Sequence, residues 1–261
     1  MNLTVFGCGH ISCDSGLLHS GEVSGDMAQI PVTCFLVQHP RGLLLWDTGM
    51  NPAVRTDPLG HWGGVAKRTL VPNLGPGESV VERLASAGVP RADIDVVVNS
   101  HLHNDHCGMN LSFPSSRVLI RERELAHARE LMDVKSSGFI RADFFGNGDQ
   151  FEVCEYEDEY DIFGDGKVKL ISTAGHTPGH QCLQVTFPSG QSYVLSGDAV
   201  YTHEQLCAHR PSGISWDKEA MVRGAQRLDD LAKTGARILV AHDPEEWSGL
   251  TSSQLIHEEM N

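Results

Sequence analysis

The chain of 261 residues is long enough for one large domain or two small ones. Its net charge of −14 argues against nucleic acid and anionic membrane surfaces as partners, because both are bound by basic patches. No apolar run approaches the roughly 20 residues that span a bilayer, and the N-terminal residues lack the pattern of a signal peptide. Seven cysteines without a C-x-x-C pair indicate free thiols in a reducing compartment, so we expect a soluble cytoplasmic protein.

Short strands are predicted in the first part of the chain, at residues 3–6, 31–37 and 42–46. The third strand ends at Asp47, where a carboxylate can point into a site, although a solvated turn residue remains the alternative. The segments 7–30 and 50–77 are expected to be long loops, which in a compact domain serve a site or an interface. A helix is predicted over 78–87.

A cluster of potential metal ligands follows the apolar run 94–98, which is predicted to be a buried strand. The cluster has the pattern H-x-H-x-D-H and consists of His101, His103, Asp105 and His106. Alternation along an extended chain would place the first two histidines on one side. Packing alone has no use for so many imidazoles together, so the sequence predicts a metal centre with more than one ion.

The middle of the chain is predicted to contain a strand at 117–120 and a helix at 122–132, whose charged residues are interleaved along an exposed face. His127 is expected on the surface of this helix. Residues 133–150 read as a loop whose phenylalanines (139, 144 and 145) form a lid or an interface. The acidic run from 152 to 165 reads as a solvated hairpin.

The last part repeats one arrangement, in which a predicted strand ends near a residue able to bind a metal. The strand at 168–173 precedes His176, the hairpin of 181–187 and 191–195 precedes Asp198, and the strand at 237–241 precedes His242; a helix is predicted over 217–233. Five histidines and two carboxylates exceed the four positions of one zinc ion. Two ions bridged by a carboxylate fit this number, with Zn²⁺ favoured and Mn²⁺, Fe²⁺ or Co²⁺ chemically possible. The absence of a linker-like segment predicts a single domain over 1–261, of the mixed α+β class.

The combined ligand pattern resembles that of the metallo-β-lactamase superfamily. This resemblance implies a four-layer αβ/βα sandwich with metals at one edge of two facing sheets. Asp198-Ala199-Val200-Tyr201 is similar to the Asp-x-x-Tyr of N-acyl homoserine lactone lactonases, and segments 56–64, 160–166 and 242–247 are similar to the agrobacterial type of acyl-homoserine-lactone and γ-butyrolactone lactonases. Residues 96–107 also resemble those of 4-pyridoxolactonase.

The resemblance implies a role for each residue of the pattern. One metal would be held by His101, His103 and His176, the other by Asp105, His106 and His242, with Asp198 bridging the two. A hydroxide between the ions would attack the lactone carbonyl. Tyr201 would donate a hydrogen bond to the carbonyl oxygen, and Asp105 would pass a proton to the departing ring oxygen. Asp47 would orient a ligand histidine.

Several functions remain open from the sequence. N-acyl homoserine lactones are the first candidate substrates, with γ-butyrolactone or 4-pyridoxolactone as alternatives. A thioesterase of the glyoxalase-II type is disfavoured by Tyr201, and a non-catalytic binding protein is disfavoured because all the catalytic positions are filled. Asn104 stands where the similar lactonases often have Phe or Leu, which bears on acyl-chain preference. A homodimer is expected, with the loops at 7–30 and 50–77 as candidate interfaces.

Overall fold

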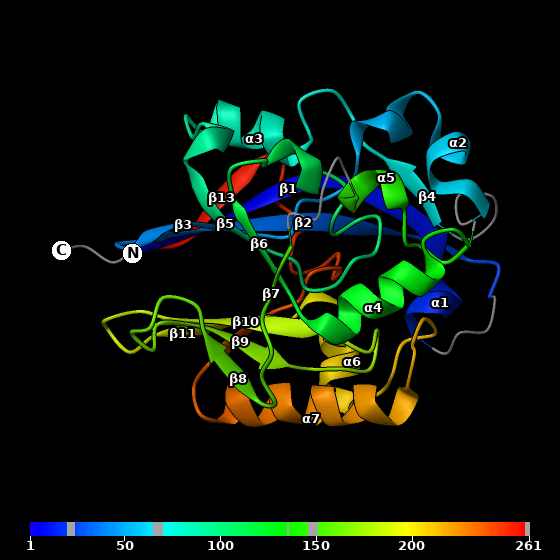
Figure 1. Ribbon diagram of the computed structural model, residues 1–261. Coiled ribbons are helices and arrows are strands. Elements are labelled where there is room, and N and C mark those ends of the chain that lie inside the picture. Colours follow the sequence, from blue (N-terminus) through cyan, green and yellow to red (C-terminus); the bar gives the residue numbers. More distant parts are fainter. Residues whose placement is uncertain (20–23, 65–69, 135, 146–150, 259–261) are drawn as a thin grey trace.

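The computed structural model describes residues 1–19, 24–64, 70–134, 136–145 and 151–258. Two sheets face each other, with helices on the outer side of each (Figure 1). The four-layer α+β sandwich implied by the resemblance is therefore confirmed. Within the described residues, no helix is long and apolar enough to cross a membrane.

The larger sheet has the strand order β13-β1-β2-β3-β5-β6-β7, with β4 paired to β1. Its strands are β1 (Asn2–Asp14), β2 (Met27–His39), β3 (Gly42–Trp46), β4 (Leu70–Asn73), β5 (Ile94–Val98), β6 (Arg117–Ile120), β7 (Phe151–Val153) and β13 (Ser253–Glu258). Strands β3, β5, β6 and β7 pair in parallel, so their carboxyl ends meet at one edge.

The smaller sheet has the strand order β12-β11-β10-β9-β8. Its strands are β8 (Glu159–Asp161), β9 (Val168–Ser172), β10 (Gln181–Thr186), β11 (Ser192–Leu195) and β12 (Arg237–Leu239). Strands β11 and β12 are parallel, so the residues that follow them also lie at one edge.

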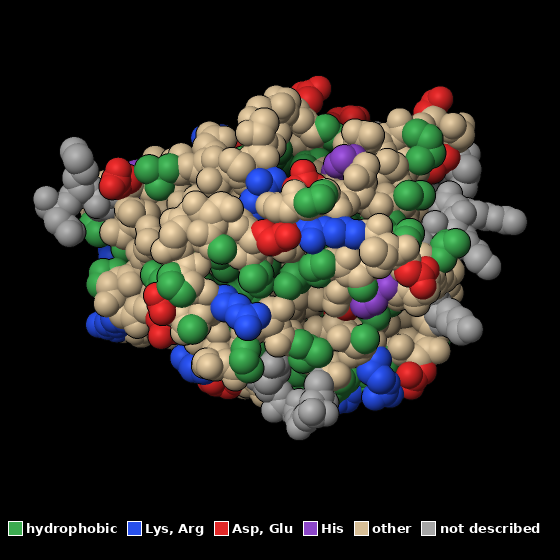
Figure 2. Space-filling model, turned by 90° about the horizontal axis from the view of Figure 1, so that it is seen from above, with side chains coloured by type: hydrophobic (Ala, Val, Ile, Leu, Met, Phe, Trp, Pro, Cys, Tyr) green, Lys and Arg blue, Asp and Glu red, His purple; other side chains and the backbone are tan. Residues whose placement is uncertain are grey.

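Helices α2 (Pro58–Trp62), α3 (Val80–Ser86) and α5 (Arg141–Phe144) lie above the larger sheet in Figure 1, and α6 (His203–Ala208) and α7 (Lys218–Lys233) lie below the smaller one. Helices α1 (Ser15–His19) and α4 (Glu122–Leu131) lie near the right-hand end of the sandwich in this view. On the face above the larger sheet, side chains of both charges are interspersed with apolar ones (Figure 2).

Local sequence explains where α3 and α7 begin. Ser79 accepts the backbone N–H of Glu82, whose carboxylate accepts the Ser79 N–H in return, which is a capping box for α3. Asp217 caps α7 by accepting the N–H of Ala220. The buried face of α7 carries Met221 and its apolar neighbours, and it covers the smaller sheet.

The core between the sheets is formed by alternate residues of their inner faces. Phe35, Leu44 and Trp46 from the larger sheet pack with Leu170 and Leu183 from the smaller one. Because side chains alternate along a strand, every second residue of β2 and β3 enters this layer. The strand at 94–98 is buried as predicted and lies in the middle of the larger sheet.

The prediction of a long exposed loop at 7–30 is wrong for most of the segment. Strand β1 continues to Asp14, where it pairs with β2 on one side and with β4 on the other. Glycines and polar residues hide this strand in the sequence, but Cys8, Ile11 and Cys13 are buried. The segment 50–77 was also predicted to be a loop, yet it includes α2 and β4.

Two predictions for the middle of the chain are corrected as well. The acidic run is not a hairpin, because β7 pairs with β6 in the larger sheet whereas β8 pairs with β9 in the smaller one. Phe139 and Phe144 are not a lid; they are 2% and 0% exposed and pack with Leu102 and Leu125. All seven cysteines are free, as predicted.

Candidate metal centre

The turn that carries the first ligand cluster begins where β5 ends at Val98. Residues 101–103 are not part of the strand, so the alternation expected for the two histidines does not apply. A tight turn orients the two histidines instead. In this turn the N–H groups of His106 and Cys107 both donate to the carbonyl of His103 at 3.0 Å. Gly108 closes the turn because a Cβ there would lie 2.4 Å from the backbone N of Asn51.

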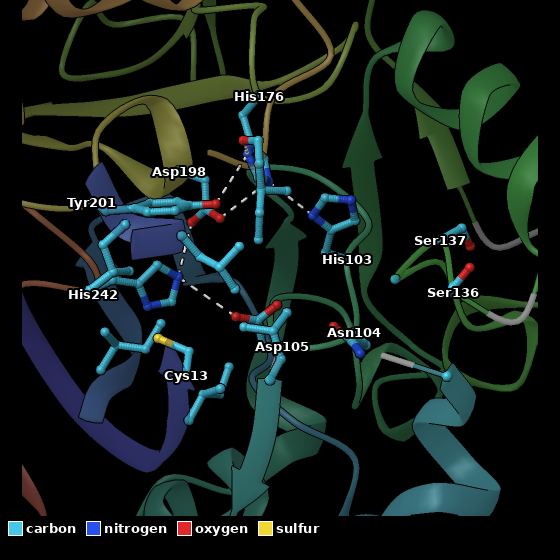
Figure 3. A pocket seen from close by; sticks show the side chains of 18 residues that line it. Cys13, His103, Asn104, Asp105, Ser136, Ser137, His176, Asp198, Tyr201 and His242 are labelled. Carbon is cyan, nitrogen blue, oxygen red and sulfur yellow. Dashed lines mark hydrogen bonds and ion pairs between the residues drawn. The ribbon is translucent and has the colours of Figure 1, made fainter. Parts of the chain in front are cut away.

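The other candidate ligands come from the smaller sheet. His176 follows β9, Asp198 lies in the short 3₁₀ turn after β11, and His242 follows β12. Figure 3 shows these side chains pointing toward one another, with Tyr201 beside them. The edge at which the strands end thus brings together residues that are far apart in the sequence.

All seven predicted ligand residues lie within one cluster. The groups whose ligand atoms lie within 4.8 Å of one another are His101, His103 and His176; His101, His106 and Asp198; and Asp105, His106 and His242. Asp198 lies between the first of these groups and the third. Its Oδ1 is 3.1 Å from His106 Nε2 and its Oδ2 is 3.2 Å from His176 Nε2.

The Nδ1 atoms of three of these imidazoles face away from the cluster and donate hydrogen bonds to nearby acceptors. His176 Nδ1 donates to the carbonyl of Ile214 at 2.9 Å, and His242 Nδ1 donates to the carbonyl of Pro31 at 2.8 Å. His106 Nδ1 donates to Asp47 Oδ2 at 2.8 Å. Because a neutral imidazole carries one proton, each of these rings presents an unprotonated Nε2 to the centre of the cluster.

This arrangement brings lone pairs face to face. His242 Nε2 lies 3.3 Å from His106 Nε2, and His176 Nε2 lies 3.2 Å from His101 Nε2. Asp198 Oδ1 is buried and accepts no hydrogen bond. Facing lone pairs and a bare carboxylate oxygen repel one another unless a cation lies between them, so the donor set fits divalent metal ions with N and O ligands.

The electrostatics of the cluster agree with this chemistry. Burial, together with the neighbouring imidazoles, holds the pKa of His101 well below 6.5, which keeps a metal-binding lone pair free. Burial alone would raise the pKa of Asp198, but positive charge at His106 and His242 outweighs burial and holds the pKa well below 3.8. Burial likewise lowers the pKa of both histidines, but Asp198 and Asp105 outweigh it and raise the pKa, so these carboxylates favour positive charge between them and the two rings. Burial and the charge of Asp198 raise the pKa of Tyr201 well above 10, so Tyr201 remains a hydrogen-bond donor.

Asp47 connects the cluster to the larger sheet. Its Oδ1 accepts the backbone N–H of Ser100 at 2.7 Å, and its Oδ2 accepts both the Ser100 hydroxyl and His106 Nδ1. The Ser100 Oγ in turn lies 3.0 Å from His101 Nδ1. The carboxylate predicted to orient a ligand histidine therefore contacts His106 directly and His101 through Ser100.

Two residues around the site were not predicted. Glu124 is not one of the exposed charged residues expected on its helix, because it is 0% exposed. Its oxygens accept the N–H groups of Leu102 at 3.0 Å and Gly179 at 3.1 Å. Burial raises the pKa of Glu124 to about 7. His180 Nε2 accepts the backbone N–H of Asp198 at 2.9 Å. The helical pattern around Glu124 does not indicate that this residue supports the site. The close spacing of His176 and His180 does indicate that His180 lies near the metal ligands.

A cavity of ≈ 290 Å³ opens onto the cluster, close to the lower end of the range for small-molecule sites. The polar part of its lining, called the polar wall, consists of five candidate ligands (His103, Asp105, His176, Asp198 and His242) together with Asn104, Ser136 and Ser137. The apolar part, called the apolar wall, consists of Ile11, Cys13, Leu17, Leu18, Ile30, Leu70 and Ile214. Tyr201 also lines the cavity.

Comparison with known proteins agrees with this architecture. Residues 28–250 match the model of the metallo-β-lactamase superfamily. The chain is 35% identical over 242 residues to the N-acyl homoserine lactonase AttM of Azorhizobium caulinodans, with 92% of each chain covered. It is 33% identical over 243 residues to AttM of Agrobacterium fabrum, again with 92% of each covered.

Solved structures show the same fold. An N-acyl homoserine lactone hydrolase with the product N-hexanoyl-L-homoserine bound at its catalytic metal centre superposes with a TM-score of 0.83, at 24% identity over 95% of each chain. The dizinc quorum-quenching lactonase AidC superposes with a TM-score of 0.65 at 18% identity, over 99% of this chain and 95% of its own. The chain belongs to the metallo-β-lactamase superfamily and, within it, to the family of the N-acyl homoserine lactonases.

Proposed function

We propose that this protein is a metal-dependent lactonase that opens the ring of N-acyl homoserine lactones and so interrupts the signals that such lactones carry. The observation that carries the proposal is the cavity itself, where converging imidazole nitrogens, Asp198 and Tyr201 share one lining with leucine and isoleucine side chains. The named activities of the similar lactonases support the same assignment.

The proposed cofactors are two Zn²⁺ ions per chain, with Mn²⁺, Fe²⁺ or Co²⁺ as substitutes. One ion would be held by His101, His103 and His176, the other by Asp105, His106 and His242, and Asp198 would contact both. When bound, such ions lower the pKa of water to near neutrality and polarise a carbonyl oxygen. The position of Asp198 between the outer histidine groups supports this division.

The chain's own residues would act on the lactone as follows. Tyr201 keeps its proton at neutral pH and donates a hydrogen bond to the carbonyl oxygen as negative charge develops there. One water molecule adds its oxygen to the carbonyl carbon while the bond from that carbon to the ring oxygen breaks. Asp105 takes a proton from the attacking water and delivers it to the released ring oxygen, so the product is a hydroxy acid.

The apolar wall supports a substrate with a hydrocarbon substituent. Leu17, Leu18 and Leu70 line the same cavity as the metal ligands. Burial of each methylene of an acyl chain on such a surface is worth about 0.8 kcal/mol. An acyl-homoserine lactone presents a ring to the polar wall and a chain to the apolar wall.

A pH-stat panel of lactones, combined with metal analysis, tests this function. We expect about two ions per chain, ring opening of N-acyl homoserine lactones, and slower opening of γ-butyrolactone. Hydrolysis of S-lactoylglutathione in preference to every lactone would replace the proposal with a thioesterase. A folded protein that carries one ion and is fully active would contradict the two-metal site.

Two further expectations belong to this proposal. The free cysteines support a reducing cytoplasm, which fractionation of the source cells would test. The homodimer stays a prediction, and light scattering of the purified protein measures it directly.

A further inference from the structure

Asn104 occupies an unusual position between two candidate metal ligands. It lines the cavity, is 3% exposed, and its Nδ2 has no hydrogen-bond partner. Its backbone is fixed, because its N–H donates to the carbonyl of Gly138 at 3.0 Å. A buried amide nitrogen without a partner is costly, since the unmade hydrogen bond forfeits the interaction with water that the group had before folding.

The surroundings of Asn104 show which group could pair with it. In Figure 3 the side chain lies between Asp105 and Ser136, on the polar side of the cavity. Among the described residues, no acceptor lies within hydrogen-bond distance of its Nδ2. A ligand in the cavity can supply this acceptor if it presents a polar group close to the reacting ring while its hydrocarbon part contacts the apolar wall.

The side-chain amide has a donor on one edge and an acceptor on the other. Half a turn about its last bond exchanges the two, so Asn104 matches any group that offers both a carbonyl oxygen and an N–H. A secondary amide is such a group. In an N-acyl homoserine lactone, this amide is attached directly to the ring, which places it next to the metal ligands when the ring is there.

We propose that Asn104 is a specificity-determining residue that hydrogen-bonds to the amide of the ring substituent. It selects lactones that carry an amide over lactones that carry a plain hydrocarbon chain. This inference rests on the proposed function, because it assigns a part of the substrate to a part of the same cavity.

The test compares two substrates in the wild-type protein and in Asn104→Leu, an apolar variant of similar size. The substrates are N-hexanoyl homoserine lactone and α-heptyl-γ-butyrolactone, whose ring substituents have equal length but only the first of which has an amide. We expect the wild-type kcat/KM to favour the amide by about tenfold, the equivalent of one hydrogen bond. In Asn104→Leu we expect this ratio to fall about tenfold, because kcat/KM for the amide loses a hydrogen bond that the alkyl lactone never makes.

Leu70→Ala is the matched control, since it alters an apolar residue of the same cavity. It should lower kcat/KM for both substrates by the same factor, so that their ratio is kept. Should Asn104→Leu lose metal or fail to fold, Asn104→Ala takes its place, and the wild-type ratio still decides. Equal kcat/KM for the two substrates in the wild-type protein would overturn the inference, whereas failure to open any lactone would overturn the proposed function instead.

Discussion

The two walls of the cavity are built in different ways. The polar wall consists of turns in which hydrogen bonds to Asp47 and to backbone carbonyls fix the ligand side chains, while Glu124 fixes the backbone of Leu102 and Gly179. The apolar wall consists mainly of residues from the second half of β1, from α1, from β2 and from β4, and it is fixed by hydrophobic packing. Atoms on the polar wall have one correct position, whereas the apolar wall only has to exclude water.

This difference predicts two kinds of response to mutation. Loss of a group on the polar wall removes a step of the reaction or a metal ion, so the effect should be large. Loss of a methyl group on the apolar wall reduces the contact area with the substrate, so the effect should be graded. The predictions below measure how far this contrast holds.

The largest effect is expected for Asp198→Asn, which removes the charge that lies between the histidine groups. Metal content and hydrolysis should fall together, with activity reduced more than about 100-fold, because even residues that only orient metal ligands are worth 10- to 100-fold. Metal analysis and initial rates on the same preparation measure this. The control is Asp230→Asn, which replaces a carboxylate on α7 whose side chain is 75% exposed. This substitution should change neither metal content nor activity. Full activity in Asp198→Asn would contradict the assignment.

Tyr201→Phe should slow turnover by about 100-fold and leave the metal content intact, as expected for the loss of one donor to a developing oxyanion. The wild-type rate should show no decline from tyrosine ionisation below pH 10, because the pKa of Tyr201 lies well above that value. Rates and metal content across pH test both statements. Unchanged kcat in the variant would remove Tyr201 from the mechanism.

Asp47→Asn should weaken metal binding by about 10- to 100-fold, because the uncharged amide no longer holds His106 and Ser100 in place. Competition with a chelator, followed by metal analysis, measures the affinity. Saturating metal should restore most of the activity, which separates this role from that of Tyr201. The control is Asp95→Asn, an exposed residue whose carboxylate accepts the N–H of Leu43. If chelator resistance is equal in wild type and Asp47→Asn, this residue does not support the centre.

Leu18→Ala should have the smallest effect. We expect the preference for N-hexanoyl homoserine lactone over γ-butyrolactone to drop about fourfold, the equivalent of one buried methylene group. The control is Leu231→Ala, a similar truncation on α7, where the residue packs under the smaller sheet. A drop of 100-fold or more for Leu18→Ala would show that the apolar wall also positions the reacting ring, and the contrast between the walls would fail.

Prediction from sequence succeeded where residue type and position are tied to a local pattern. The strand at 94–98, the helix over 217–233 and the strand at 117–120 have apolar periodicity, and the structure agrees with them within about two residues. Prediction failed for β1, because glycines and polar side chains mask a strand that is stabilised by neighbours on both sides. It failed for Glu124 because a buried carboxylate at the start of a helix looks like a surface one.

By itself, the sequence determined the ligand types, since three histidines and an aspartate within six residues have few uses other than binding metal. Only the tertiary structure decided which nitrogen of each imidazole faces the centre, because that depends on acceptors such as Pro31 and Ile214, which are distant in the chain. The tertiary structure also decided that Ile11, Cys13, Leu17, Leu18 and Ile30 line the same cavity as the metal ligands. Strand pairing is a non-local interaction, so the sequence of one strand does not specify which other strands pair with it.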